Sequence, residues 1–94
     1  MPSYLLELNL PKADSLERAS DDARRVEAAS TVVGGGVRYV RTLFIAEEET
    51  CFHVFEAPSR DDVVEAAAHA GLADARVTEA LQNTEPTTTQ RRVR

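Results

Sequence analysis

Residues 50–58, Thr-Cys-Phe-His-Val-Phe-Glu-Ala-Pro, form the densest run of strand-forming residues in the chain. Aromatic and β-branched side chains favour a pleated, buried strand, and Pro58 ends the run because it cannot donate to a hydrogen-bond ladder. The same run holds the single cysteine of the sequence and two of its three phenylalanines. It therefore predicts a central strand around which the other elements are arranged.

The first half of the chain supplies three further elements. Apolar residues alternate along the opening segment, and Pro11 closes that strand. Asp14 followed by Glu17 resembles a capping pair, after which an alanine-rich stripe recurs at helical spacing. Three glycines at 34–36 interrupt this pattern, and no phosphate-loop signature follows them. The periodicities predict a strand over 4–10, a helix over about 14–30 and a strand over 37–45.

The second half repeats the alternation of strand and helix. Glutamates 47–49 are typical of a solvated hairpin turn and lack the ligand spacing of a calcium loop. Ser59 with Asp62 has the form of a capping box. Gly71 stands where a left-handed helix end is expected, with Leu72 as the apolar residue that follows it. A short last strand is predicted over 75–81.

The resulting order, β-α-β-β-α-β, predicts an α+β domain of the ferredoxin-like type over residues 1–82. Its four strands form one antiparallel sheet in the order 4-1-3-2, with both helices on one face. Residues 83–94 are polar and basic, contain no large apolar side chain except Val93, and are expected to form a flexible tail.

The sheet face without helices is expected to carry both large apolar and polar side chains. With Leu6, Leu8, Phe52 and Val54 facing the helices, strict alternation assigns the remaining strand residues to this open face. Such a surface is too apolar to be left in water, so we expect a homodimer through it. The residues assigned to it are Leu5, Glu7, Asn9, Tyr39, Arg41, Leu43, Cys51, His53 and Phe55.

Composition excludes several classes of partner. The net charge is −5, and the negative charge lies before the basic tail, so no basic stripe suggests nucleic acid binding. No apolar run approaches the roughly 20 residues of a membrane span. One cysteine allows no internal disulfide, and the opening residues contain no signal segment, which together lead us to expect a cytoplasmic protein.

The chain resembles a family of small actinobacterial proteins named after a nickel-binding member. The resemblance covers residues 1 to about 82, and its strongest marker is the Glu-Ala-Pro triplet before a helix that ends in Ala-Gly-Leu. It implies a ferredoxin-like homodimer with nickel as a possible ligand. Many relatives carry cysteine where His53 stands, whereas here the cysteine lies two residues earlier. The matching segments are 1–5, 36–40, 49–58, 70–72 and 77–79.

His53 is the leading candidate for a metal ligand, with Glu7 on the adjoining central strand as its partner. One imidazole and one carboxylate suit a divalent transition metal, and Asn9 or Cys51 could complete the shell. Two or three ligands are too few for a tight site unless a two-fold axis doubles them or water fills the remaining positions. The alternative is that His53 only forms hydrogen bonds to Glu7 or Arg41 in a polar patch of the dimer interface.

Three other residues complete the expected site. Cys51 lies two residues from His53, about 6 to 7 Å along the strand, which is too far for a direct hydrogen bond and favours an inert buried thiol over a nucleophile. Arg41, on the other flank of His53, could hold a small anionic ligand or serve as the counterion of Glu7. Tyr39 is expected to line the same face.

These observations leave three functional hypotheses. The first is a non-catalytic protein that binds nickel or another divalent metal at the open face. The second is a dimeric module that binds a small organic ligand or only its own second copy. The third, an enzyme, lacks a credible acid–base pair in the sequence.

Overall fold

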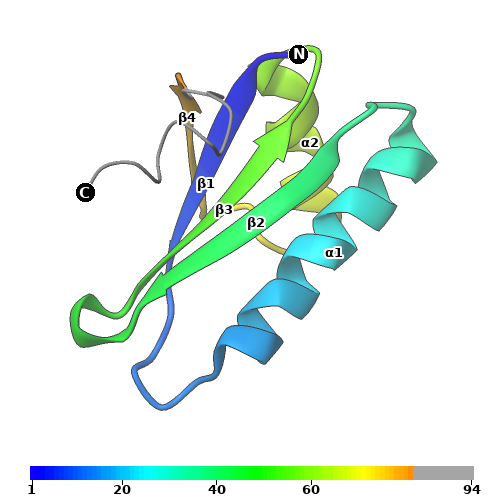
Figure 1. The fold of residues 1–94 in the computed structure, drawn as a ribbon. Helices are drawn as coiled ribbons and strands as arrows, with labels where there is room; N and C mark the ends of the chain where they lie inside the picture. Colours follow the sequence, from blue (N-terminus) through cyan, green and yellow to red (C-terminus); the bar gives the residue numbers. More distant parts are fainter. Residues whose placement is uncertain (82–94) are drawn as a thin grey trace, which may run out of the picture.

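The computed structural model describes residues 1–81, so the tail expected over 83–94 lies outside the described part of the chain. The elements follow the predicted β-α-β-β-α-β order (Figure 1). A short 3-10 turn, η1, forms the hairpin loop between the second and third strands. The elements are β1 (Ser3–Asn9), α1 (Leu16–Val33), β2 (Arg38–Ile45), η1 (Ala46–Glu48), β3 (Thr50–Glu56), α2 (Arg60–His69) and β4 (Arg76–Ala80).

The four strands form one antiparallel sheet in the order β2-β3-β1-β4. Figure 1 shows both helices on the same side of this sheet, with α1 along β2 and α2 behind the other half. The ferredoxin-like fold and the strand order are therefore confirmed. The chain has two layers, and we refer to the two sides of the sheet as the covered face and the open face.

The helix boundaries follow from their capping residues. Ser59 accepts a hydrogen bond from the Asp62 amide, as expected for the start of α2. The start of α1 differs from the prediction, because Ser15 and not Asp14 is the N-cap and accepts from the Arg18 amide. At the end of α2, Gly71 has φ +86° and the Leu72 amide donates to the Ala67 carbonyl, which is the predicted left-handed termination.

The core lies between the helices and the covered face. Leu6 and Phe55 from the sheet are fully buried against Val26 of α1 and Val63 of α2. Small residues on both helices bring them close to the sheet, as the alanine-rich stripe predicts. The buried stripe of α1 begins at Ala19, since Leu16, at the first turn, is 53% exposed.

The face assignment of β3 in the sequence analysis was wrong. Tyr4, Leu6 and Leu8 of β1 face the helices and stand directly opposite Phe55, His53 and Cys51. Residues directly opposite one another in an antiparallel pair share a face, so these three β3 residues lie on the covered face. Phe52 and Val54 lie on the open face instead. The metal pair expected from His53 and Glu7 is thereby separated, because Glu7 stands opposite Phe52.

Strand β2 also departs from strict alternation. Tyr39 pairs with Phe55, whereas the next pair is Arg41 with Val54, so Val40 is an extra residue in the register. This bulge assigns Tyr39 to the covered face and Arg41 to the open face. The expected open-face positions of Leu5, Glu7, Asn9, Arg41 and Leu43 agree with the observed register, while those of Tyr39, Cys51, His53 and Phe55 do not.

Candidate functional site

A chain of polar contacts runs through the covered face. The Tyr39 hydroxyl and Thr42 Oγ1 share a hydrogen bond of 2.6 Å, and Thr42 Oγ1 lies 2.8 Å from Nδ1 of His53. Cys51 Sγ lies against the ring, 3.7 Å from Nε2 and 3.9 Å from Nδ1. His53 and Cys51 are fully buried. Both ring nitrogens of His53 therefore have a polar neighbour inside the core.

Burial determines the protonation of this pair. It lowers the pKa of His53 to about 4, and the negative charge of Asp22 on α1 offsets only part of that effect. Burial, together with the smaller effect of the Asp22 charge, raises the pKa of the Cys51 thiol to about 11. At neutral pH the core therefore holds a neutral imidazole and a protonated thiol.

The contact between Cys51 and His53 is closer than the sequence analysis expected. The repeat along a strand separates alternate residues by 6 to 7 Å, but this spacing applies to the backbone. Both side chains project into the same layer and approach within 3.7 Å, which is within reach of a weak sulfur hydrogen bond. The prediction of a buried thiol is nevertheless confirmed.

Sequence reasoning missed two members of this network. Thr42 went unnoticed because the bulge at Val40 hides its alternation with Tyr39. Asp22 carries a readable signal, because it lies three residues after Ala19 and four before Val26 on the buried stripe of α1. That spacing directs it toward the sheet, where its charge acts on both His53 and Cys51.

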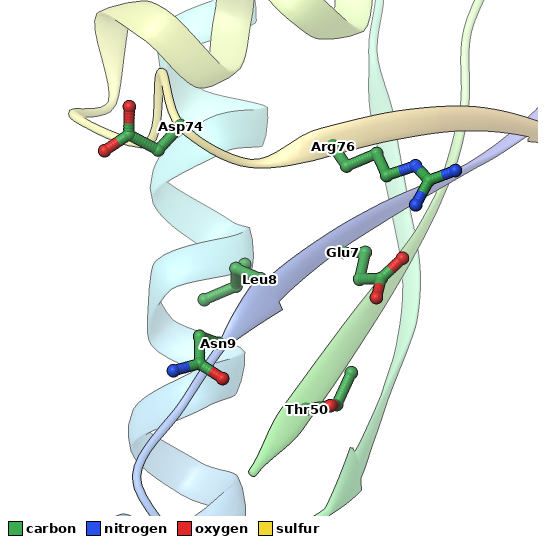
Figure 2. A pocket seen from close by; sticks show the side chains of 6 residues that line it. All are labelled: Glu7, Leu8, Asn9, Thr50, Asp74 and Arg76. Carbon is green, nitrogen blue, oxygen red and sulfur yellow. The ribbon is translucent and has the colours of Figure 1, made fainter. Parts of the chain in front are cut away.

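Two of the other expected site residues, Glu7 and Asn9, meet at the end of β1. They line a depression of about 220 Å³, together with Leu8, Thr50, Asp74 and Arg76. Figure 2 shows Glu7 and Arg76 close together on neighbouring strands, with Asp74 at the far rim and its carboxylate directed away from Glu7. An adjoining depression on the same face is lined by Glu7, Ile45, Glu48, Thr50 and Phe52.

An apolar strip occupies the rest of the open face. Leu43 and Ile45 of β2 are 51% and 45% exposed. Phe52, opposite Leu43 on β3, is half-buried, and so is Leu5 on β1, diagonal to Phe52. Charged residues border the strip. Arg41 is exposed on β2, and Arg38 donates to the carboxylate of Glu56 at the opposite end of the face from η1. That hydrogen bond lowers the pKa of Glu56.

The donor groups of one chain do not complete a nickel site. Among residues 1–81, no three His, Cys, Asp or Glu side chains converge in a way that could hold a metal ion. His53 and Cys51 are enclosed beneath α1, with Nδ1 bonded to Thr42 and the thiol protonated, so this pair does not fit a metal as it stands. Glu7 and Asn9 are accessible, but they offer one carboxylate and one amide beside the cationic Arg76.

Comparison with known proteins identifies one family. A family model described as "Nickel responsive protein SCO4226-like" matches residues 4–80, which is most of the chain. No curated protein and no solved structure matches significantly. Within the described residues, neither helix has the length and apolar content that crossing a membrane requires.

Proposed function

The chain belongs to the SCO4226-like family of nickel responsive proteins, and on that premise we propose that it is a non-catalytic, nickel-binding homodimer. Two copies join through their open faces, and nickel is held at the rim of that interface near Glu7. The dimer follows from the composition of the open face. The metal follows from the family, and its place from the accessible oxygen donors.

The exposed apolar strip is the observation that carries the proposal. Leu43 and Ile45 leave about half of their surface in water, and the half-buried Phe52 stands opposite Leu43. Each fully buried side chain of this kind contributes about 1.5–3 kcal/mol relative to the exposed state. Because these side chains are already about half-buried, a second copy that covers the strip would gain about half of this energy per side chain, and it would gain it from each of the two sheets.

The charges around the strip favour a second copy of the same chain over a partner whose surface carries charge of a single sign. Arg41 and Arg76 lie on the open face together with Glu7 and Glu56. A two-fold interface places each surface against itself, so a face that carries both signs can pair its own arginines with the partner's carboxylates. The electrostatic pattern is thus compatible with self-association.

Pairing also addresses the shortage of metal ligands. One copy contributes Glu7 and Asn9 at the depression, and a second copy would double these oxygen donors, with water completing an octahedral shell. Imidazole, a ligand well suited to nickel, is absent from this face among the described residues, since His53 is enclosed and His69 lies on α2. We therefore expect modest affinity.

The state of the buried pair supports a non-catalytic function. A nucleophilic cysteine needs a thiolate and access to solvent, whereas burial raises the pKa of Cys51 to about 11 and leaves it fully enclosed. His53, also enclosed, cannot reach a substrate on the open face. The two residues best suited to acid–base or nucleophilic chemistry are thus withdrawn into the core.

Calorimetric titration with nickel, combined with sedimentation, tests the proposal. Glu7→Gln should weaken nickel binding at least tenfold while the dimer persists, because the change removes a charge and conserves the shape. Glu65→Gln, on the exposed side of α2, is the matched control and should bind as the wild type does. Nickel binding unaffected by Glu7→Gln would overturn the proposed site, and a wild-type monomer at micromolar concentration would overturn the dimer.

A further inference from the structure

The buried polar chain links the two ends of the bulge in β2. Val40 is the extra residue, and Tyr39 and Thr42 therefore point into the same layer on either side of it. Their side chains bond to one another at 2.6 Å, and Thr42 is anchored by the His53 ring at 2.8 Å. Since bulges interrupt the regular ladder, side-chain bonds of this kind help to fix the local backbone.

Helix α1 closes over the same region. Glu27 of α1 accepts a hydrogen bond of 3.0 Å from the Tyr39 amide. The His53 ring also contacts two aromatic rings edge-on, with centroids 6.5 Å from Tyr39 and 6.2 Å from Phe55. The imidazole therefore sits where the bulge, the central strand and the first helix meet.

We infer that His53 is an acid-sensitive latch: proton uptake by its buried ring loosens the bulged segment of β2 and the adjoining part of α1 before the rest of the sheet. The latch is a property of one copy and does not depend on the proposed dimer or on nickel. In the neutral ring, Nδ1 bonds to Thr42, and Cys51 Sγ lies against the ring at 3.9 Å from Nδ1 and 3.7 Å from Nε2. A charged ring would remain inside the core without a full counter-charge.

The groups that face His53 explain why the positive charge of a protonated ring would be only partly compensated. From β2 it meets the ring of Tyr39 and the hydroxyl of Thr42, and from β3 the protonated Cys51. From α1 the charge of Asp22 acts on it, but the Asp22 carboxylate also forms an ion pair of 2.8 Å with Arg25. Glu27, the other carboxylate of α1 near this region, binds the Tyr39 amide. Burial therefore dominates, and it lowers the pKa of His53 to about 4.

The sign of the pH effect follows directly. An unfolded histidine binds a proton with a pKa of about 6.5, whereas the folded ring resists protonation until about pH 4. Between these values the unfolded state binds more protons. The contribution of His53 to stability is therefore fully present above pH 6.5 and is lost as the pH is lowered. The His53 contribution alone should raise the unfolding equilibrium constant about 20-fold between pH 7 and pH 5.

Denaturant unfolding at pH 7 and pH 5 tests the latch. His53→Gln cannot be protonated and should lose this 20-fold component, so its stability should change less than that of the wild type. His69→Gln, which alters the exposed histidine on α2, should retain it. A purely structural role would lower the stability of the His53 variant equally at both pH values, and that result would overturn the inference.

Two measurements on the wild type keep the test valid if the variant does not fold. The His53 ring should show no NMR titration near pH 6.5, and a normal titration there would refute the latch. Hydrogen-exchange protection of the amides at 39–42, corrected for intrinsic rates, should fall on acidification more than that of β1. Equal loss of protection in both strands would contradict a local opening.

Discussion

The two faces of the sheet handle polar and apolar side chains in opposite ways. The covered face encloses a histidine, a cysteine and parts of Tyr39 and Thr42 in a connected set of contacts. The open face exposes Leu43 and Ile45 and borders them with charges. Polar groups buried in the core and apolar groups exposed to water both cost free energy. The interior network therefore specifies one local structure, whereas the exterior strip is the surface that we propose for dimerisation.

The two phenylalanines of β3 provide the most direct comparison of the faces. Phe55→Ala should lower the free energy of unfolding by about 3–5 kcal/mol, because it removes a fully buried ring from the main core. Phe52→Ala, the matched change on the open face, should cost the monomer about 1–2 kcal/mol, because its ring is only half-buried. Urea unfolding at pH 7, at a concentration where the chain is monomeric, measures both. Equal losses would contradict the distinction between the faces.

Leu43→Asp tests the open face as a partner surface. The change places a charge in the middle of the strip and should weaken dimerisation about 100-fold, which corresponds to about 3 kcal/mol. The folded monomer should persist, since this side chain is 51% exposed. Sedimentation and circular dichroism measure the two effects separately. Val64→Asp, at an exposed apolar position of α2, is the control, and an equal effect of both changes on association would argue against the open face.

Most of the fold could be predicted because its signals are local. The switch between alternating and helical periodicity gave the element order, and the short connections then determined the strand order. Ser59 and Gly71 predicted where α2 begins and ends, because their capping roles depend on backbone groups only a few residues away. At α1 the choice between Asp14 and Ser15 was missed, since both residue types cap helices well.

The site could be predicted only in part, because β3 is apolar on both faces. Phe52 and Val54 alternate with Cys51, His53 and Phe55, so periodicity alone cannot choose the covered side. The hairpin offered a better signal. A four-residue loop over 46–49 pairs Ile45 with Thr50, which aligns Phe44 with Cys51 and Leu43 with Phe52. The bulge at Val40 had no comparable sequence signal. Because of this bulge, Tyr39 lies on the covered face and Arg41 on the open face.

Thr42→Val tests whether the covered network is more than a set of packed side chains. Valine conserves the shape but removes the hydroxyl that connects Tyr39 to His53, which leaves Nδ1 of the ring without that bond. The expected loss in unfolding free energy is about 1–3 kcal/mol. Thr78→Val, on the exposed open-face side of β4, is the control and should change little. A loss no larger than that of the control would mean that the network contributes packing only.

Arg38→Ala should have the smallest effect and sharpens the contrast between the faces. Arg38 donates to Glu56 at the exposed end of the open face, and this hydrogen bond is the main cause that lowers the pKa of the carboxyl. Its contribution is present above the ordinary pKa of glutamate and is lost as the pH falls through the lowered value. NMR titration of Glu56 should show the pKa rising in the variant, while stability at neutral pH stays close to that of the wild type, because exposed ion pairs contribute little.

The two faces should therefore lose stability in separate pH ranges. The His53 contribution is lost between pH 6.5 and about 4, and the Glu56 contribution only below the usual range of glutamate. A stability change in Arg38→Ala that already develops between pH 7 and pH 5 would show that the open-face pair and the buried ring are coupled, and the two faces could then no longer be treated as independent.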